Sequence, residues 1–412
     1  MHQRVDKTAL NEFNRQSVMN VIRNHTAISR SEVSDITGLS IPTIMKIADS
    51  FLEVGLLREI GKRQSTGGKP AVLLEFLPDS YFCVGIDIGT NKILGIMMDC
   101  AANIIYRYSI PNDIEATNEV FMDKVAMVIE HVLEHSGKTM DKVLGIGVGI
   151  SGLVRTEDHK VVFSPILQRK DFNLYSFLCE RFQSLVLLDN ISRVMALGEK
   201  YFGHCCTCDN FLFVNLGYGI GSSMCMNGEI YNGSKGYFGE VGHMIVNPLG
   251  TRCACGNRGC LETIASAIAI VREARYYINA HESTMMEYMI EGDLDKLDAI
   301  HVFEAAKQGD KIALDIVMNA IDYLGMGIAN MTNILDPEYV VLGGGISLAG
   351  NFLLQPLTEA WQKYRMSYSG EHTKLVISKF GDDAAAIGAA AQVFDSLTRK
   401  GYKPQKLLMN RV

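Results

Sequence analysis

The chain has 412 residues, of which 48% are hydrophobic and 21% are charged, and its net charge is −7 at pH 7. These values exclude a single ordinary domain and predict a globular protein of two or three domains with a large core. No apolar run approaches the roughly 20 residues of a membrane helix, and the first ten residues lack the apolar segment of a signal peptide. We therefore expect a cytoplasmic protein without membrane insertion, whose ten cysteines are thiols or metal ligands.

Residues 1–78 are predicted to form three helices followed by a two-stranded wing. Apolar residues recur at helical spacing from about Leu10 to Asn24, Ser29 and Glu32 form a capping box for a second helix, and Pro42 falls in the first turn of a third. The second and third helices with their short turn predict a helix-turn-helix. Residues 1–76 contain ten Lys/Arg and eight Asp/Glu, a balance of +2 that leaves −9 for the remainder and permits a nucleic-acid contact at this end.

The candidate DNA contacts lie on the second and third helices and at the Gly-rich tip of the wing. In a helix-turn-helix the second helix enters the major groove, and basic loops contact phosphates. The candidates are Ser29, Arg30, Ser40, Pro42, Thr43, Lys46, Lys62, Arg63 and Lys69. One such module contacts too few bases for a specific site, so binding to operator double-stranded DNA would require a dimer. The alternative is a small helical interaction domain with a solvated basic loop.

The remainder of the chain predicts an α/β fold of two similar lobes, at residues 79–203 and 204–382. A meander of three strands begins at Tyr81 and is followed by a helix, and the same pattern starts again at Phe211. Repetition of one pattern indicates internal duplication with a cleft between the lobes. A final Ala-rich helix at residues 383–398 has the small side chains of a closely packed face.

Three glycine loops follow strands of these lobes and are candidate phosphate-binding loops. Backbone N–H groups in such turns can bind a phosphate, and an adjacent Asp can lie near a metal. The residues are Asp87, Gly89, Thr90 and Lys92 in the first loop, Gly217, Gly219 and Gly221 in the second, and Gly344 in the third. Each loop alone is also explained as a tight hairpin, whereas the three together favour descent from a phosphoryl-transfer enzyme.

The segment from Phe238 to Glu262 contains a candidate zinc site formed by His243, Cys253, Cys255 and Cys260. One imidazole and three thiols without a carboxylate match the tetrahedral coordination of a structural Zn²⁺. The alternatives are four unrelated buried residues or a disulfide. Glu240 and Glu262 flank the site and are free to face a polar pocket. The segment from His204 to Cys208 is a weaker second cluster that we interpret as a variable connection between lobes.

Across nearly its whole length the chain resembles the ROK family (repressors, open reading frames and kinases), and in particular its repressor branch. The resemblance is carried by the segments ISRSEVSDITGLSIPTIMKIADSFLEVGLL, GIDIGTNKI, DNISRVMALGE, NLGYGIGSSMCMNGEIYNG, GEVGHMIVNPLGTRCACGNRGCLE and VVLGGGIS. It implies a winged helix-turn-helix followed by an actin-like, RNase H-like two-lobed kinase fold, with the final helix completing the first lobe.

The resemblance also implies the zinc on His243 and the three cysteines, and a sugar site. In ROK proteins the residues that match Glu240, His243 and Glu262 hold sugar hydroxyls, and we assign Ser151, Gly152 and Asn190 to the same site. Carboxylates accept hydrogen bonds from hydroxyls, and a metal on one imidazole nitrogen orients the other toward the sugar.

Two departures from the kinase pattern favour a repressor over an enzyme. ROK kinases have a catalytic Asp at the position of Ile191, and Ile191 cannot act as a base. Tyr218 stands where the kinases usually have a Thr. We therefore expect a sugar-responsive repressor that acts as a homodimer or homotetramer, with a monosaccharide or sugar phosphate as effector. Arg193 could alter which sugar fits.

The alternatives are an active sugar kinase that uses Asp189 as its base, and a regulator titrated by a membrane transporter domain.

Overall fold

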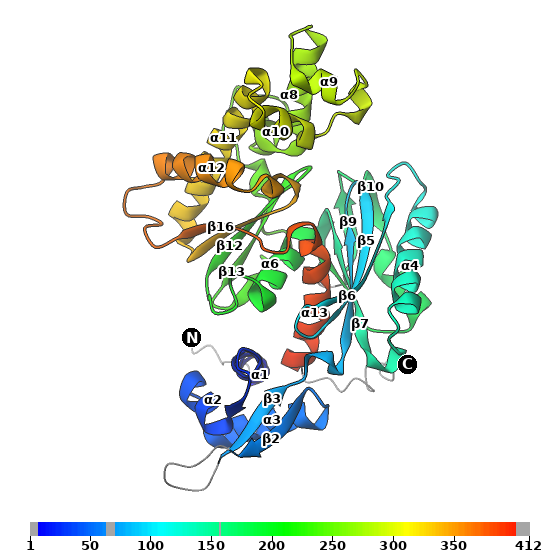
Figure 1. Cartoon of the computed structure of the whole chain (residues 1–412), viewed down its shortest axis with the longest axis vertical. Helices are drawn as coiled ribbons and strands as arrows, with labels where there is room; N and C mark the ends of the chain where they lie inside the picture. The colour runs from blue at the N-terminus through cyan, green and yellow to red at the C-terminus, as the bar shows by residue number, and fades with distance from the viewer. Residues whose placement is uncertain (1–6, 63–70, 156–157, 401–412) are drawn as a thin grey trace.

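The computed structural model describes residues 7–62, 71–155 and 158–400 (Figure 1). The N-terminal unit contains the predicted helices and wing, at α1 (Lys7–Arg23), α2 (Arg30–Thr37), α3 (Ile41–Glu53), β2 (Leu57–Lys62) and β3 (Val72–Phe76). A short strand that the sequence did not predict, β1 (Ile28–Ser29), pairs with β3 to give the order β1-β3-β2. This arrangement is a winged helix-turn-helix.

Local sequence accounts for the start and end of α2. The Ser29 hydroxyl accepts from the backbone N–H of Glu32, and the Glu32 carboxylate accepts from the N–H of Ser29, which confirms the predicted capping box. Gly38 ends the helix in the left-handed region at φ 70°. Ser40 occupies the N-cap position of α3, but its hydroxyl contacts that of Thr43 instead of capping the helix.

The first lobe is built on a five-stranded sheet of order β11-β7-β4-β5-β6. Strands β4, β5 and β6 form the predicted antiparallel meander, and β7 and β11 add to it in parallel. A small sheet of order β10-β9-β8 was not predicted. The elements are β4 (Phe82–Ile88), β5 (Lys92–Asp99), β6 (Ile104–Pro111), α4 (Asn118–His135), β7 (Val143–Ile150), β8 (Leu153–Val154), β9 (Val161–Ser164), β10 (Arg169–Phe172), α5 (Leu174–Phe182), β11 (Val186–Asn190) and α6 (Ile191–Phe202).

The second lobe repeats this topology with the order β14-β13-β12-β15-β16, so the predicted duplication is present in the fold. Helices α8, α9 and α10 lie at the top of the view in Figure 1, and α11 packs against both α10 and α12. The elements are β12 (Phe211–Leu216), β13 (Ile220–Met226), β14 (Glu229–Tyr231), α7 (Glu262–Ala265), α8 (Ala267–Asn279), α9 (Met285–Met289), α10 (Ala299–Lys307), α11 (Lys311–Leu335), β15 (Tyr339–Gly343), α12 (Asn351–Tyr364) and β16 (Lys374–Ile377).

The last helix, α13 (Ala384–Lys400), returns to the first lobe and lies between its sheet and α6 (Figure 1). A Cβ added at Gly85 of β4 would lie 2.0 Å from the Ala386 carbonyl oxygen, and one at Gly388 would lie 2.0 Å from that of Val194 on α6. Only glycine permits such close backbone approach. The Ala- and Gly-rich sequence of α13 is therefore what allows it to join the sheet to α6.

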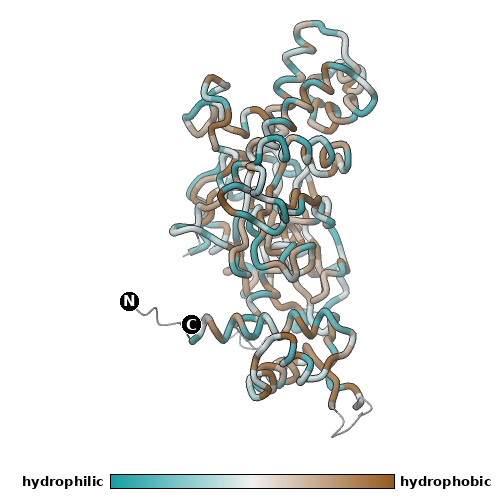
Figure 2. Tube along the Cα trace, turned by 90° about the vertical axis from the view of Figure 1, so that its left-hand side faces the viewer, coloured by the Kyte–Doolittle hydropathy of each residue, from teal (hydrophilic) through white to brown (hydrophobic). Residues whose placement is uncertain are grey.

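Among the described residues, the buried apolar side chains form one large core in the second lobe and three smaller clusters, one of which joins the sheet of the second lobe to α6 and α13. One of them continues from α1 and α3 of the N-terminal unit into the first lobe and α13, through residues such as Ile22, Phe51 and Phe394. Hydrophobic stretches run through the middle of the molecule (Figure 2). Among the described residues, α11 alone is long and apolar enough to cross a membrane, but its buried residues belong to the core of the second lobe.

Candidate functional site

The four predicted metal ligands converge on one point. All four ligand atoms lie within 4.8 Å of one another, and this is the only such group of three or more in the described part of the chain. The Cys253 sulfur lies 3.6 Å from Nδ1 of His243, and the Cys255 and Cys260 sulfurs are also 3.6 Å apart. Tetrahedral zinc with bonds of about 2.3 Å to sulfur and 2.0–2.1 Å to nitrogen separates its ligands by roughly 3.5–3.8 Å. The residues therefore fit a zinc ion, whereas a disulfide would need sulfurs about 2.05 Å apart.

Tight backbone turns bring these ligands together. The backbone N–H of Gly256 donates to the Cys253 carbonyl, and the N–H of Cys253 donates to the Asn257 carbonyl. Gly259 has φ 69°, and a Cβ at this position would lie 1.5 Å from the Asn247 carbonyl oxygen. The position therefore tolerates no side chain, and Cys260 follows directly from it, fully buried.

The flanking carboxylates lie on one side of this cluster. Nε2 of His243, the ring nitrogen that does not face Cys253, is 3.9 Å from the Glu240 carboxylate. Glu262, the first residue of α7, accepts a hydrogen bond of 3.0 Å from the Ile220 N–H. A Cβ at Gly219 would lie 2.5 Å from the same carboxylate, so the second glycine loop packs directly against Glu262.

Enclosure changes the ionisation of Glu240. Although 46% of its side chain is accessible, the surrounding protein raises the pKa of the Glu240 carboxyl, and the nearby Glu262 raises it further. His243 and Arg193 act in the opposite direction. Two adjacent carboxylates of this kind are suitable acceptors for the hydroxyl groups of a neutral polar ligand.

The start of α6 contacts the second glycine loop, which also packs against Glu262. Asn190 caps the helix by accepting from the Ser192 N–H at 2.8 Å, and its amide donates at 2.8 Å to the carbonyl of Gly152, next to Ser151. A Cβ added at Gly221 would lie only 2.5 Å from the Ser192 hydroxyl, so the backbone of Gly221 packs closely against this side chain. Asn190 and Gly152 are therefore held together, and α6 contacts the second glycine loop.

Ile191, which the family resemblance aligns with the kinase base, is the first residue of α6 and packs partly buried against an apolar cluster. The neighbouring Arg193 is 3% exposed and forms an ion pair with Asp189. Its guanidinium also donates to the carbonyls of Val154 and Gly236. Asp189 and Arg193 thus neutralise each other's charge, an arrangement that the sequence did not predict.

The first two glycine loops are bridged by side chains. Asn91 donates from its amide to the Tyr218 hydroxyl, which donates at 3.2 Å to Asp298. Burial raises the pKa of the Tyr218 phenol, and Asp298 adds to this effect, so the hydroxyl keeps its proton. Lys92 forms an ion pair with Asp382 next to α13.

Asp87 and Gly344 occupy constrained positions in these loops. One oxygen of the nearly buried Asp87 is without a hydrogen-bond partner among the described residues, and burial raises the pKa of this carboxyl to about 7. Gly344 has φ 84°, and a Cβ there would lie 2.4 Å from the amide oxygen of Asn215. Gly344 therefore brings the third glycine loop against β12, the strand that precedes the second glycine loop.

The N-terminal unit presents part of the predicted DNA-facing surface. Ser40, Pro42 and Lys46 are exposed at the start of α3, and Thr43 is half-buried. Ser29 is only 3% exposed and caps α2, and Arg30 is paired at 3.0 Å with both Asp49 and Glu59. Arg63 and Lys69 lie outside the described residues, as does the side chain of Lys62.

The weaker cluster, His204 to Cys208, does not assemble four ligands. Cys205 and Cys208 are buried, and burial raises the pKa of both thiols. Nε2 of His204 lies 3.2 Å from the Ile377 carbonyl. The segment packs as a connection between α6 and β12.

These features define a two-lobed, actin-like chain that carries a winged helix-turn-helix and a His/Cys cluster beside paired carboxylates. The model of the ROK family matches residues 83–395. The chain belongs to the ROK family.

Relatives of two kinds match it. The xylose repressor of Bacillus subtilis (strain 168) is 30% identical over 393 residues, covering 95% of this chain and 97% of the relative. A glucokinase of Halalkalibacterium halodurans is 33% identical over 309 residues, covering 74% of this chain and 92% of the enzyme. The solved structure of a ROK family transcriptional regulator, a homologue of the E. coli MLC protein, is 26% identical, covers 97% of this chain and 99% of that one, and has a TM-score of 0.81. The repressor relatives thus extend over the N-terminal unit, and the fold class predicted from the sequence is confirmed.

Proposed function

We propose that the protein is a sugar-responsive transcriptional repressor of carbohydrate-utilisation genes, which binds operator DNA in the cytoplasm as a homodimer or homotetramer. The observation that carries this proposal is the combination in one chain of a winged helix-turn-helix with a ROK cleft, matched over 95% of its length to a xylose repressor. The proposed units are residues 1–78 for DNA binding, 79–203 with helix 383–398 for the first lobe, and 204–382 for the second lobe.

The proposed DNA contacts are the exposed residues at the start of α3, with the basic tip of the wing. Ser40, Pro42 and Lys46 are accessible there, and Thr43 lies beside them. A dimer would present two such helices to successive major grooves, and the spacing between them would determine operator affinity.

The proposed metal is a structural zinc held by His243, Cys253, Cys255 and Cys260. Two of their separations, of 3.6 Å each, match tetrahedral coordination, and all four ligand atoms lie within 4.8 Å of one another. When bound, the ion supplies folding energy to a segment that has little secondary structure of its own. It would also fix the imidazole through Nδ1, which leaves Nε2 directed toward Glu240.

The proposed effector site lies between that imidazole and the start of α6. Glu240, Glu262, Asn190 and the His243 imidazole supply acceptors and donors for hydroxyl groups, with Ser151 and Gly152 at the edge. A neutral monosaccharide is favoured over a sugar phosphate, because Arg193, at the start of α6, is buried and already bonded to Asp189 and two carbonyls.

Helix α6 supports a direct link between effector and DNA. Its first turn carries Asn190 and Ser192 in the proposed effector site, and its last residues contact α1. There the Tyr201 hydroxyl accepts at 2.9 Å from Gln16, and the Arg23 guanidinium lies 4.9 Å from the centre of the Phe202 ring. Twelve helical residues span about 18 Å. A displacement of α6 by the effector would therefore move Tyr201 and Phe202, which contact α1 of the N-terminal unit.

Three observations favour a regulator over a kinase. The residue that the family resemblance aligns with the catalytic base is an isoleucine, Ile191, and Asp189 is paired with Arg193. The Asn91–Tyr218–Asp298 hydrogen bonds occupy the space between the first two glycine loops. Loss of a general base alone removes about 10²–10⁴-fold of rate.

The proposal is tested by fluorescence anisotropy with DNA from upstream of the protein's own gene and of neighbouring carbohydrate genes, titrated with and without a panel of monosaccharides. We expect one sugar to change the DNA affinity, and Glu262→Gln to abolish that response while DNA binding without sugar persists. Glu273→Gln, on the exposed face of α8, is the matched control. Unchanged DNA affinity with every sugar, together with capture of a transporter domain that does weaken DNA binding, would replace the proposal by titration through a protein partner.

The alternative that the protein is a sugar kinase is suggested by the glucokinase relative, and it is tested by a separate measurement of turnover. A coupled assay with Mg-ATP and the same sugars should show no turnover. Clear turnover that is lost in Asp189→Asn would establish an enzyme.

A further inference from the structure

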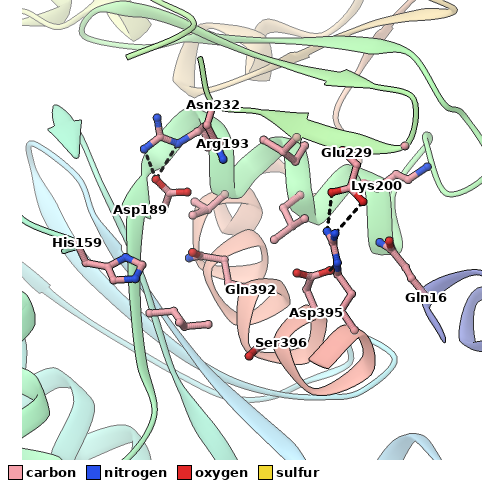
Figure 3. A pocket seen from close by; sticks show the side chains of 16 residues that line it. Gln16, His159, Asp189, Arg193, Lys200, Glu229, Asn232, Gln392, Asp395 and Ser396 are labelled. Carbon is pink, nitrogen blue, oxygen red and sulfur yellow. Dashed lines mark hydrogen bonds and ion pairs between the residues drawn. The ribbon is translucent and has the colours of Figure 1, made fainter. Parts of the chain in front are cut away.

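A cavity of about 330 Å³ lies between the N-terminal unit and both lobes (Figure 3). Its walls come from α1, β11, α6, β14 and α13, which contribute among others Gln16, Asp189, Ile230, Gln392 and Arg399. Neither Glu240, His243 nor Glu262 lines it, although Arg193 at the start of α6 lies near both this cavity and the proposed effector site. The volume is at the lower end of the range of about 300–1,000 Å³ for small-molecule sites.

The charged groups of the lining compensate one another. Arg193 pairs with Asp189 on one wall, and on another Arg399 pairs with Glu229 and lies near Asp395 (Figure 3). Lys200 donates to the carbonyl of Cys208. With three basic and three acidic side chains in the lining, the cavity has no net charge to attract an ion. Its occupant is therefore expected to be neutral.

Two polar atoms at the cavity lack partners. Nε2 of Gln392, a donor, and Oδ1 of Asn232, an acceptor, are buried without a hydrogen bond within the described part of the chain. Buried polar groups are normally paired, with protein, water or ligand. A hydroxyl group can accept from one such atom and donate to another. Apolar side chains complete the lining, at Leu187, Val194, Leu197 and Ile230.

We propose that this cavity is a second ligand site, which takes a neutral polyhydroxylated molecule of monosaccharide size. The amides of Gln392 and Asn232, whose unpaired atoms are covered by neighbouring protein atoms, would turn toward the cavity to bind its hydroxyls. The four apolar side chains would contact its C–H face. Its regulatory consequence rests on the proposed function. Because Gln16 belongs to α1 and Arg399 to α13, a molecule in the cavity contacts the DNA-binding unit and the helix that supports it.

The experiment is isothermal titration of the full chain with D-xylose, D-glucose, N-acetyl-D-glucosamine and myo-inositol in turn. We expect a binding event that survives in Glu262→Gln and is weakened at least about tenfold in Gln392→Met, which keeps the side-chain length but removes the amide. Gln308→Met, exposed at the end of α10, is the matched control. Should Gln392→Met fail to fold, Asn232→Leu removes the other unpartnered atom.

This experiment can overturn the second ligand site without overturning the proposed effector site, and the reverse. Loss of binding in Glu262→Gln alone, with Gln392→Met and Asn232→Leu unaffected for every probe, would overturn the second site and leave the proposed effector site intact. Binding that depends on Gln392 and not on Glu262 would support the cavity even if the effector site were wrong. Ordered water alone in the cavity of a crystal soaked with all four probes would also overturn the proposal.

Discussion

The guanidinium of Arg399 on α13 makes two hydrogen bonds, of 2.7 and 2.8 Å, to the carboxylate of Glu229 on β14. The same guanidinium lies 3.9 Å from Glu12 of α1 and 4.0 Å from Asp395 of its own helix. One side chain therefore stands among carboxylates of the N-terminal unit, the second lobe and the helix that completes the first lobe. A change in the position of the second lobe would alter which carboxylate Arg399 binds.

We expect Glu229→Gln to reduce the ratio of DNA dissociation constants measured with and without effector. The substitution removes the charge that holds Arg399 on β14, so movement of the second lobe is no longer passed to α1. Glu229 is 43% exposed, so the free energy of unfolding should change by at most about 1 kcal/mol. Glu304→Gln, which breaks the exposed pair with Lys307 on α10, should leave the ratio unchanged. Equal ratios in wild type and Glu229→Gln would show that coupling follows another route.

Removal of one metal ligand should show whether the four residues bind zinc or are simply packed together. Cys255→Ser is expected to lose stoichiometric zinc in metal analysis and to lower the melting temperature, because a three-ligand site holds the ion weakly. Cys255 is exposed, so the substitution itself removes little buried surface. Cys206→Ser, whose thiol donates to the carbonyls of Tyr201 and Gly203, should retain the wild-type zinc content. Full zinc occupancy in Cys255→Ser would contradict the four-ligand assignment.

The predictions that succeeded from sequence are those that depend on local chemistry or on repetition. Ser29 with Glu32 forms the capping box, and the Ala-rich segment after Asp383 forms the closely packed helix. The metal cluster was also predictable, since its three cysteines lie within eight residues of the chain. The duplicated order of strands followed from the two meanders.

The features that the sequence could not indicate depend on residues distant in the chain or on short elements. Strand β1 has two residues and exists only because β3 pairs with it. Helix α12 contains Pro356, which local rules place at helix ends. The Arg399–Glu229 pair joins residues 170 positions apart, and no periodicity relates them. The cavity bounded by α1, β14 and α13 exists only after all three have packed.

The buried carboxyl of Asp87 should make stability depend on pH. Burial raises its folded-state pKa to about 7, with Asp382 and Asp383 adding to the effect and Lys92 opposing it. The folded state then binds more protons than the unfolded state between about pH 4 and pH 7, so the free energy of unfolding falls as the pH rises through this window. The full effect is at most about 4 kcal/mol, at about 1.4 kcal/mol per unit.

Asp87→Asn removes this titration. Compared with wild type, the variant should gain melting temperature at about pH 8, and the gain should shrink toward about pH 5. Asp79→Asn, at an exposed position, is the control and should follow the wild-type profile. Parallel pH profiles for wild type and Asp87→Asn would mean that Asp87 ionises freely in the folded protein.

Lys46 tests the orientation of the winged helix on DNA. Its side chain is exposed on α3, one turn beyond Pro42, among the residues predicted to reach base edges, and its ammonium can also contact a phosphate if this helix enters the major groove. Lys46→Ala should weaken binding to specific and non-specific DNA alike, and should reduce the slope of log K against log salt by about 1 for each subunit. Lys311→Ala, exposed at the start of α11 in the second lobe, carries the same charge change and should leave the slope unaltered. An unchanged slope in Lys46→Ala would place the DNA on another face of the N-terminal unit.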